Sequence, residues 1–90
     1  MQIRFLNISY DGIFLLGYPL RLSPTEEKLL KEVANGGKTD ADTLASLLTD
    51  GVSRGNVAVH INSINRKAKK ISERKLIVYE KGRYVINGLM

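Results

Sequence analysis

The chain has 90 residues, of which 43 % are hydrophobic and 26 % charged, so it can form one small folded domain and does not have a disordered composition. It has no cysteine and one histidine, which excludes disulfides and thiolate metal sites. No carboxylate cluster replaces them, so we expect neither metal nor cofactor. No apolar run approaches the ~18 residues of a membrane span, and the N-terminus lacks a signal-peptide pattern, so we expect a cytoplasmic protein without a membrane contact.

The formal net charge of +5 is concentrated in the second half of the chain. Residues 46–90 contain 9 Lys/Arg and 3 Asp/Glu, whereas residues 1–45 contain 5 and 6. A basic half joined to a neutral half suggests a surface for a polyanion. The simpler interpretation is a basic face that only keeps the protein soluble.

Residues 1–22 are predicted to form a small antiparallel meander of short strands. Such a sheet cannot be stable alone and must pack against helices. The predicted strands are Ile3–Leu6, Ile8–Tyr10, Ile13–Leu16 and Leu20–Leu22, with turns at Asp11-Gly12 and at residues 17–19.

Three helices are predicted within residues 23–72, and the first has the clearest start. Ser23 is suited to cap it, Pro24 suits its first position, and Glu26 completes a capping box. Gly36-Gly37 ends this helix. Its acidic residues are expected on the solvated surface, and a catalytic carboxylate pair is not favoured because adjacent helical residues diverge. These residues are Glu26, Glu27 and Glu32.

The second helix is predicted to open at Thr39 and to end near residues 49–51, after an apolar face that includes Leu44 and Leu48. The third covers residues 54–71, with a start between Ser53 and Asn56. Its apolar residues recur at spacings of 4, 3, 4 and 3, which indicates a helix buried along one face. They are Val57, Ile61, Ile64, Ala68 and Ile71.

The outer face of the third helix carries no acid; it has amides and a hydroxyl in the first half and cations in the second. This pattern suits the DNA major groove, where amides read base edges and cations meet phosphates. A solvated amphipathic helix is the alternative.

Residues 75–87 are predicted to form a basic hairpin, with strands Leu76–Tyr79 and Tyr84–Ile86 and a turn at residues 80–83. Residues 87–90 are expected to fray.

The fold class predicted from this order is α+β, a single winged helix-turn-helix domain over residues 1–90. The sequence also resembles the OmpR/PhoB-type DNA-binding domain of two-component response regulators, along essentially its whole length. Three segments carry the resemblance. They are Leu22–Glu26 at the first helix, Val57–Ile61 in the recognition helix, and Lys81–Val85 in the wing.

The resemblance implies a bacterial transcription regulator that binds double-stranded DNA and catalyses no reaction. Val59 and Ser63 would face the groove floor, and His60 would approach the backbone. RNA polymerase could contact the loop at residues 50–54, and two copies could pair on tandem half-sites. The candidate DNA contacts are Asn56, Val59, His60, Asn62, Ser63, Arg66, Lys67 and Lys70 on the helix, with Lys81 and Arg83 on the wing.

Each role has a simpler alternative. An exposed valine such as Val59 is common, and Asn56 could simply cap a helix. Tyr79 and Tyr84 are expected to pack in the core or wing and not to stack on a ligand. The family usually carries arginine where Ser63 and Asn65 stand, which keeps open a second hypothesis. Under it, the domain is a winged-helix protein–protein interaction module that has lost specific DNA binding.

Overall fold

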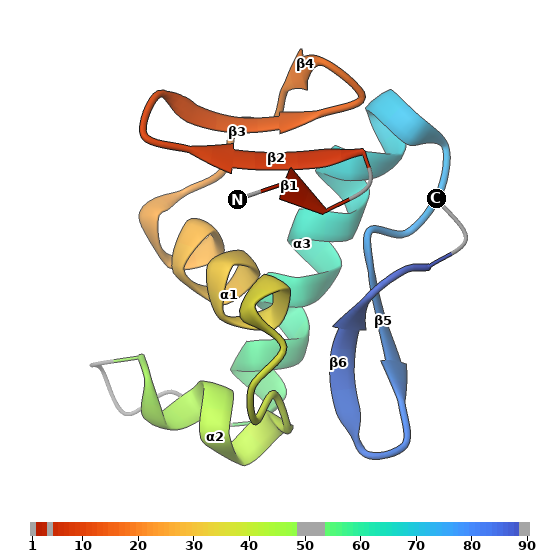
Figure 1. The fold of residues 1–90 in the computed structure, drawn as a ribbon. Coiled ribbons are helices and arrows are strands. Elements are labelled where there is room, and N and C mark those ends of the chain that lie inside the picture. The colour runs from red at the N-terminus through yellow and green to blue at the C-terminus, as the bar shows by residue number, and fades with distance from the viewer. Residues whose placement is uncertain (1, 4, 49–53, 89–90) are drawn as a thin grey trace.

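The computed structural model describes residues 2–3, 5–48 and 54–88 and has an α+β architecture (Figure 1). A four-stranded antiparallel sheet is followed by three helices and a two-stranded hairpin. The sheet lies across one end of α1 and α3, the hairpin runs beside α3, and α2 lies at the end opposite the sheet. None of the described helices is long and apolar enough to cross a membrane.

The N-terminal sheet is a meander in the order β1-β2-β3-β4. Its inner face is apolar because side chains alternate along a strand, so that Leu6 and Ile8 pair with Leu15 and Ile13 on the core side. The strands are β1 (Gln2–Ile3), β2 (Leu6–Ser9), β3 (Gly12–Leu15) and β4 (Tyr18–Pro19).

The turns of this sheet differ from the predicted ones. Ser9 pairs with Gly12, so the first turn consists of residues 10–11 and Gly12 already belongs to β3. The second turn is Leu16-Gly17, and Tyr18–Pro19 form a strand where a turn was expected. Both turn residues have positive φ, 54° and 83°, which matches the right-handed twist of the flanking strands and permits a two-residue loop.

Helix α1 (Pro24–Asn35) begins and ends as predicted. The Ser23 hydroxyl accepts a hydrogen bond from the backbone N–H of Glu26, and the Glu26 carboxylate accepts one from the backbone N–H of Ser23. Gly36 closes the helix in the left-handed conformation. The capping box is therefore confirmed.

Helix α2 (Ala41–Ser46) starts one residue later than expected, because Asp40 and not Thr39 is its cap. The Asp40 carboxylate accepts hydrogen bonds from the backbone N–H and the hydroxyl of Thr43. Thr39 is buried and bonds to Tyr84, whose backbone N–H donates to the Thr39 carbonyl at 3.0 Å. The segment before α2 is thereby tied to the hairpin. The predicted turn at residues 49–51 lies outside the described residues.

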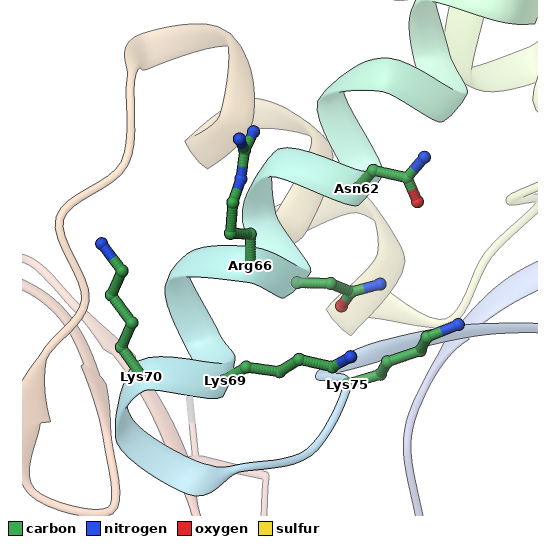
Figure 2. A pocket seen from close by; sticks show the side chains of 6 residues that line it. Asn62, Arg66, Lys69, Lys70 and Lys75 are labelled. Atoms are coloured by element: carbon green, nitrogen blue, oxygen red, sulfur yellow. The ribbon is translucent and has the colours of Figure 1, made fainter.

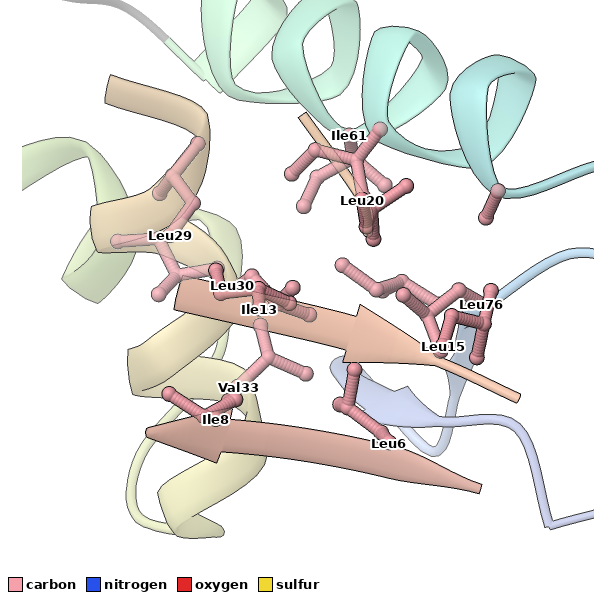
Figure 3. Packing of buried hydrophobic residues seen from close by; sticks show 14 of the residues in the cluster. Leu6, Ile8, Ile13, Leu15, Leu20, Leu29, Leu30, Val33, Ile61 and Leu76 are labelled. Atoms are coloured by element: carbon pink, nitrogen blue, oxygen red, sulfur yellow. The ribbon is translucent and has the colours of Figure 1, made fainter. Parts of the chain in front are cut away.

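Helix α3 (Arg54–Ser72) buries the apolar stripe predicted for it, with Ile71 only half-buried at the end. Val57, Ile61, Ile64 and Ala68 join the core, which leucines and isoleucines of the sheet and of α1 complete (Figure 3). Burying such side chains stabilises the fold by about 1.5–3 kcal/mol each.

The hairpin consists of β5 (Ile77–Glu80) and β6 (Arg83–Ile86), joined by Lys81-Gly82, whose φ values are both positive. Two turn residues thus replace the four expected. Asn87 does not fray: its backbone N–H donates to the Leu76 carbonyl, and its side-chain amide donates to the Lys75 carbonyl at 2.8 Å.

A buried side chain joins α3 to β5. The amide of Asn65, 6 % exposed, donates to the Ile77 carbonyl at 2.9 Å and accepts from the Ile77 N–H at 2.8 Å. The side chain at position 65 therefore points inward in this chain.

We expect Asn65→Ala to lower the free energy of unfolding by about 2–4 kcal/mol. The substitution leaves both backbone groups of buried Ile77 unpaired, and each unsatisfied group costs about 1–3 kcal/mol. Urea unfolding followed by circular dichroism measures the change. Asn62→Ala, an exposed position three residues earlier, is the matched control and should stay within about 0.5 kcal/mol. Equal effects of the two substitutions would contradict the structural role of Asn65.

Candidate nucleic-acid interface

One stripe of α3 faces solvent, opposite the buried stripe. Val59, Asn62, Arg66 and Lys70 are all exposed, and their spacing of 3, 4 and 4 places them along one side of the helix. We call these four residues the outer stripe. Val59 is 63 % exposed, so its isopropyl group is available to a ligand. The outer stripe therefore begins with an apolar and an amide group and continues with two cations.

The C-terminal half of α3 concentrates positive charge. Arg66, Lys69, Lys70 and Lys75 line an open depression of about 400 Å³ together with Asn62 and Asn65. Figure 2 shows Lys69 and Lys75 extended side by side toward the hairpin, whereas Arg66 and Lys70 point away from them. Among the described residues, none of these four cations forms an ion pair, so their charge is available to an anion.

Lys69 and Lys75 were not among the predicted contacts. Lys69 lies three residues after Arg66, on the edge of α3 that faces the hairpin. A helical wheel that included this edge of the helix would have identified Lys69 as a candidate contact. Lys75 lies beyond the helix, in the connection to β5, so helical periodicity could not place it. The run of six cations between residues 66 and 75 was the available signal.

Lys67 and Ser63 lie on the flank of α3 that faces α1 and not on the outer stripe, although the sequence predicted both as outward contacts. The Lys67 ammonium is 2.6 Å from Oε1 of Glu26, a carboxylate on a residue only 3 % exposed. Glu26 is thus buried, where a solvated surface position was expected. A buried carboxylate must be paired, and Lys67 supplies the pair while its own side chain is 39 % exposed.

The pKa of Glu26 reflects this environment. Burial alone would raise it, but hydrogen bonds from the Lys67 ammonium, the Ser63 hydroxyl and the Ser23 backbone N–H lower the pKa from 4.5 to about 2. The charged carboxylate is therefore the stable form throughout the physiological range.

The remaining predicted contacts are separated from the cationic depression. Asn56 is exposed and His60 half-buried in the first half of α3. Lys81 and Arg83 are exposed at the hairpin tip, which lies beside the α2 end of the molecule (Figure 1). The C-terminal end of α3, whose residues line the depression, lies toward the N-terminal sheet. The described residues contain no group of three or more His, Cys, Asp or Glu that could hold a metal.

Comparison with protein-family models, with curated proteins and with solved structures finds no match to this chain. A function can therefore be inferred only from the geometry of α3 and the hairpin.

The contribution of Glu26 to stability should disappear in acid. Its folded-state pKa lies below the ordinary value, so the stabilisation is present above pH 4.5 and is lost as the pH falls toward 2. A shift from 4.5 to about 2 corresponds to about 3 kcal/mol at neutral pH, of which about 2 kcal/mol is lost by pH 3.

Urea unfolding of the wild type and of Glu26→Gln at pH 7 and pH 3 isolates this contribution from that of other carboxylates. The difference between the two proteins should shrink by about 2 kcal/mol between the two pH values. A difference that does not change with pH would contradict the ion pair with Lys67.

Proposed function

We propose that the chain is a double-stranded-DNA-binding domain of the winged helix-turn-helix type, in which α3 is the recognition helix and the β5–β6 hairpin the wing. The order of sheet, three helices and hairpin supports this proposal. The observation that carries it is the outer stripe, which presents an apolar group, an amide and two cations and no acid.

In the proposed complex, α3 lies in the major groove. Val59 contacts a thymine methyl group, and Asn62 pairs with an adenine edge. Arg66 and Lys70 neutralise phosphates at the rim of the groove. The wing tip, with Lys81 and Arg83, contacts the flanking backbone near the N-terminal half of α3. The domain catalyses no reaction.

The biological role that we propose is that of an OmpR/PhoB-type output domain of a bacterial two-component regulator, acting in the cytoplasm. Tight binding by so small a surface would use two copies on tandem half-sites. A contact with RNA polymerase through residues 50–54 remains part of this proposal; residues 50–53 lie outside the described residues.

On sequence grounds, the absence of arginine at positions 63 and 65 argued against DNA binding. The locations of these two positions in the fold remove that objection. Position 65 is buried beneath β5, and Ser63 lies beside the Glu26 carboxylate. Because neither position belongs to the outer stripe, the lack of arginine there removes no charge from the proposed contact surface. We therefore favour DNA over a protein–protein interaction module.

Replacing Arg66 and Lys70 together with alanine should weaken binding to a random-sequence 20-base-pair duplex. Two lost phosphate contacts should reduce the slope of log K against log salt by about 1.8. Fluorescence anisotropy between 50 and 200 mM NaCl measures both the affinity and the slope.

The control replaces Lys28 and Lys31, two exposed lysines of α1, with alanine. It lowers the net charge by the same amount and should largely retain duplex affinity. Equal losses in the two double variants would mean that net charge alone attracts DNA. A wild type that binds no duplex at 50 mM NaCl, with its circular dichroism intact, would favour the interaction module.

A further inference from the structure

A groove of about 390 Å³ runs between α3 and the hairpin, beside the proposed duplex surface. One part of its lining is apolar, from Ile61, Ile77 and Val78; another is aromatic, from Tyr79 and Tyr84. Lys75 lines both this groove and the neighbouring cationic depression, which makes the two continuous. The combined surface offers rings at one end and ammonium groups at the other.

Tyr79 packs within the hairpin and not in the core, the two placements that the sequence left open. It is 56 % exposed, although it lies on the same face of β5 as the buried residue Ile77. Its cross-strand partner is Tyr84, and the two ring centroids are 4.9 Å apart at an interplanar angle of 68°. The edge-to-face contact orients the Tyr79 ring while more than half of the residue stays open to a planar ligand.

The cationic end of the groove is also positioned by specific contacts. The Lys75 carbonyl accepts a hydrogen bond from Asn87, and two residues later the backbone of Ile77 is held by Asn65. The backbone from which the Lys75 side chain extends is therefore fixed. Lys69 extends alongside it (Figure 2), and neither ammonium is paired with an acid among the described residues.

We infer that this groove binds a single-stranded nucleic acid, with a base stacked on Tyr79 and the adjoining phosphates on Lys75 and Lys69. An aromatic platform beside a positively charged groove is the combination by which proteins bind single strands. A duplex cannot use the platform because its bases are stacked inside the helix. An acidic peptide would satisfy the lysines but would leave the ring uncovered.

The proposed duplex contact uses neither Tyr79 nor Lys69 nor Lys75, although its residues Asn62, Arg66 and Lys70 border the combined surface. The two activities can therefore be separated by mutation. Single-stranded DNA and RNA share the chemistry that the groove recognises, and the experiment includes both.

The experiment measures anisotropy of fluorescein-labelled (dT)8 and (U)8 with the whole chain at 50 mM NaCl. Tyr79→Leu keeps the apolar bulk but removes the planar ring, and it should weaken binding about tenfold. Tyr79→Phe keeps the ring and should bind as the wild type does. Lys75→Ala should weaken binding and reduce the salt slope by about 0.7.

Tyr10→Leu is the matched control, since Tyr10 is a fully exposed tyrosine in the first turn of the N-terminal sheet. It should leave single-strand binding unchanged, and Tyr79→Leu should leave duplex affinity within about twofold.

The inference is overturned if Tyr79→Leu binds either oligonucleotide as tightly as the wild type, or if neither oligonucleotide binds the wild type while the duplex does. It is also overturned if an octaglutamate peptide displaces the oligonucleotides equally well from wild type and Tyr79→Leu. Loss of duplex binding alone, with single-strand binding retained, would overturn only the proposed function.

Discussion

Two polar contacts, one buried and one partly buried, hold α3 on its two flanks, and every surface described above depends on them. On one flank Asn65 bonds to both backbone groups of Ile77, and on the other Lys67 reaches the buried carboxylate of Glu26. Apolar burial is non-directional and would tolerate some rotation of α3 about its axis. Hydrogen bonds have fixed geometry, so these contacts determine which residues of α3 face outward. The outer stripe and the groove beside the hairpin both follow from that orientation.

Local signals in the sequence were sufficient for most of the fold. The capping box of Ser23 and Glu26 requires residues only three positions apart, and Gly36 needs only a left-handed conformation to end α1. The buried stripe of α3 follows from helical periodicity. These features depend on near neighbours in the chain, which is why they could be predicted. The exact residues of each turn were harder to predict, because several adjacent residues at each turn are of types that favour turns.

The polar interior could not be predicted in the same way, because its partners are distant in the chain. Lys67 and Glu26 are 41 positions apart, and Asn65 and Ile77 are 12 apart. A lysine and a serine on the flank of a helix look like outward residues until the neighbouring helix is placed. Asn65 did carry a signal, since it lies about 40° from Ile61 on a helical wheel and thus beside the buried stripe. Tyr79 carried none, because a tyrosine in an alternating strand fits the core as well as the surface.

The capping carboxylate of Glu26 accepts its bonds from Ser23 and from Lys67 at the same oxygen atom. Substitution of Lys67 would therefore also affect the start of α1. In the part of the chain that the structure describes, the side chains of Val59, Asn62, Arg66 and Lys70 belong to no such hydrogen-bonded network. Randomising these four codons in a library would leave the scaffold intact. New ligand preferences could thus be selected on this small domain without a compensating redesign of its interior.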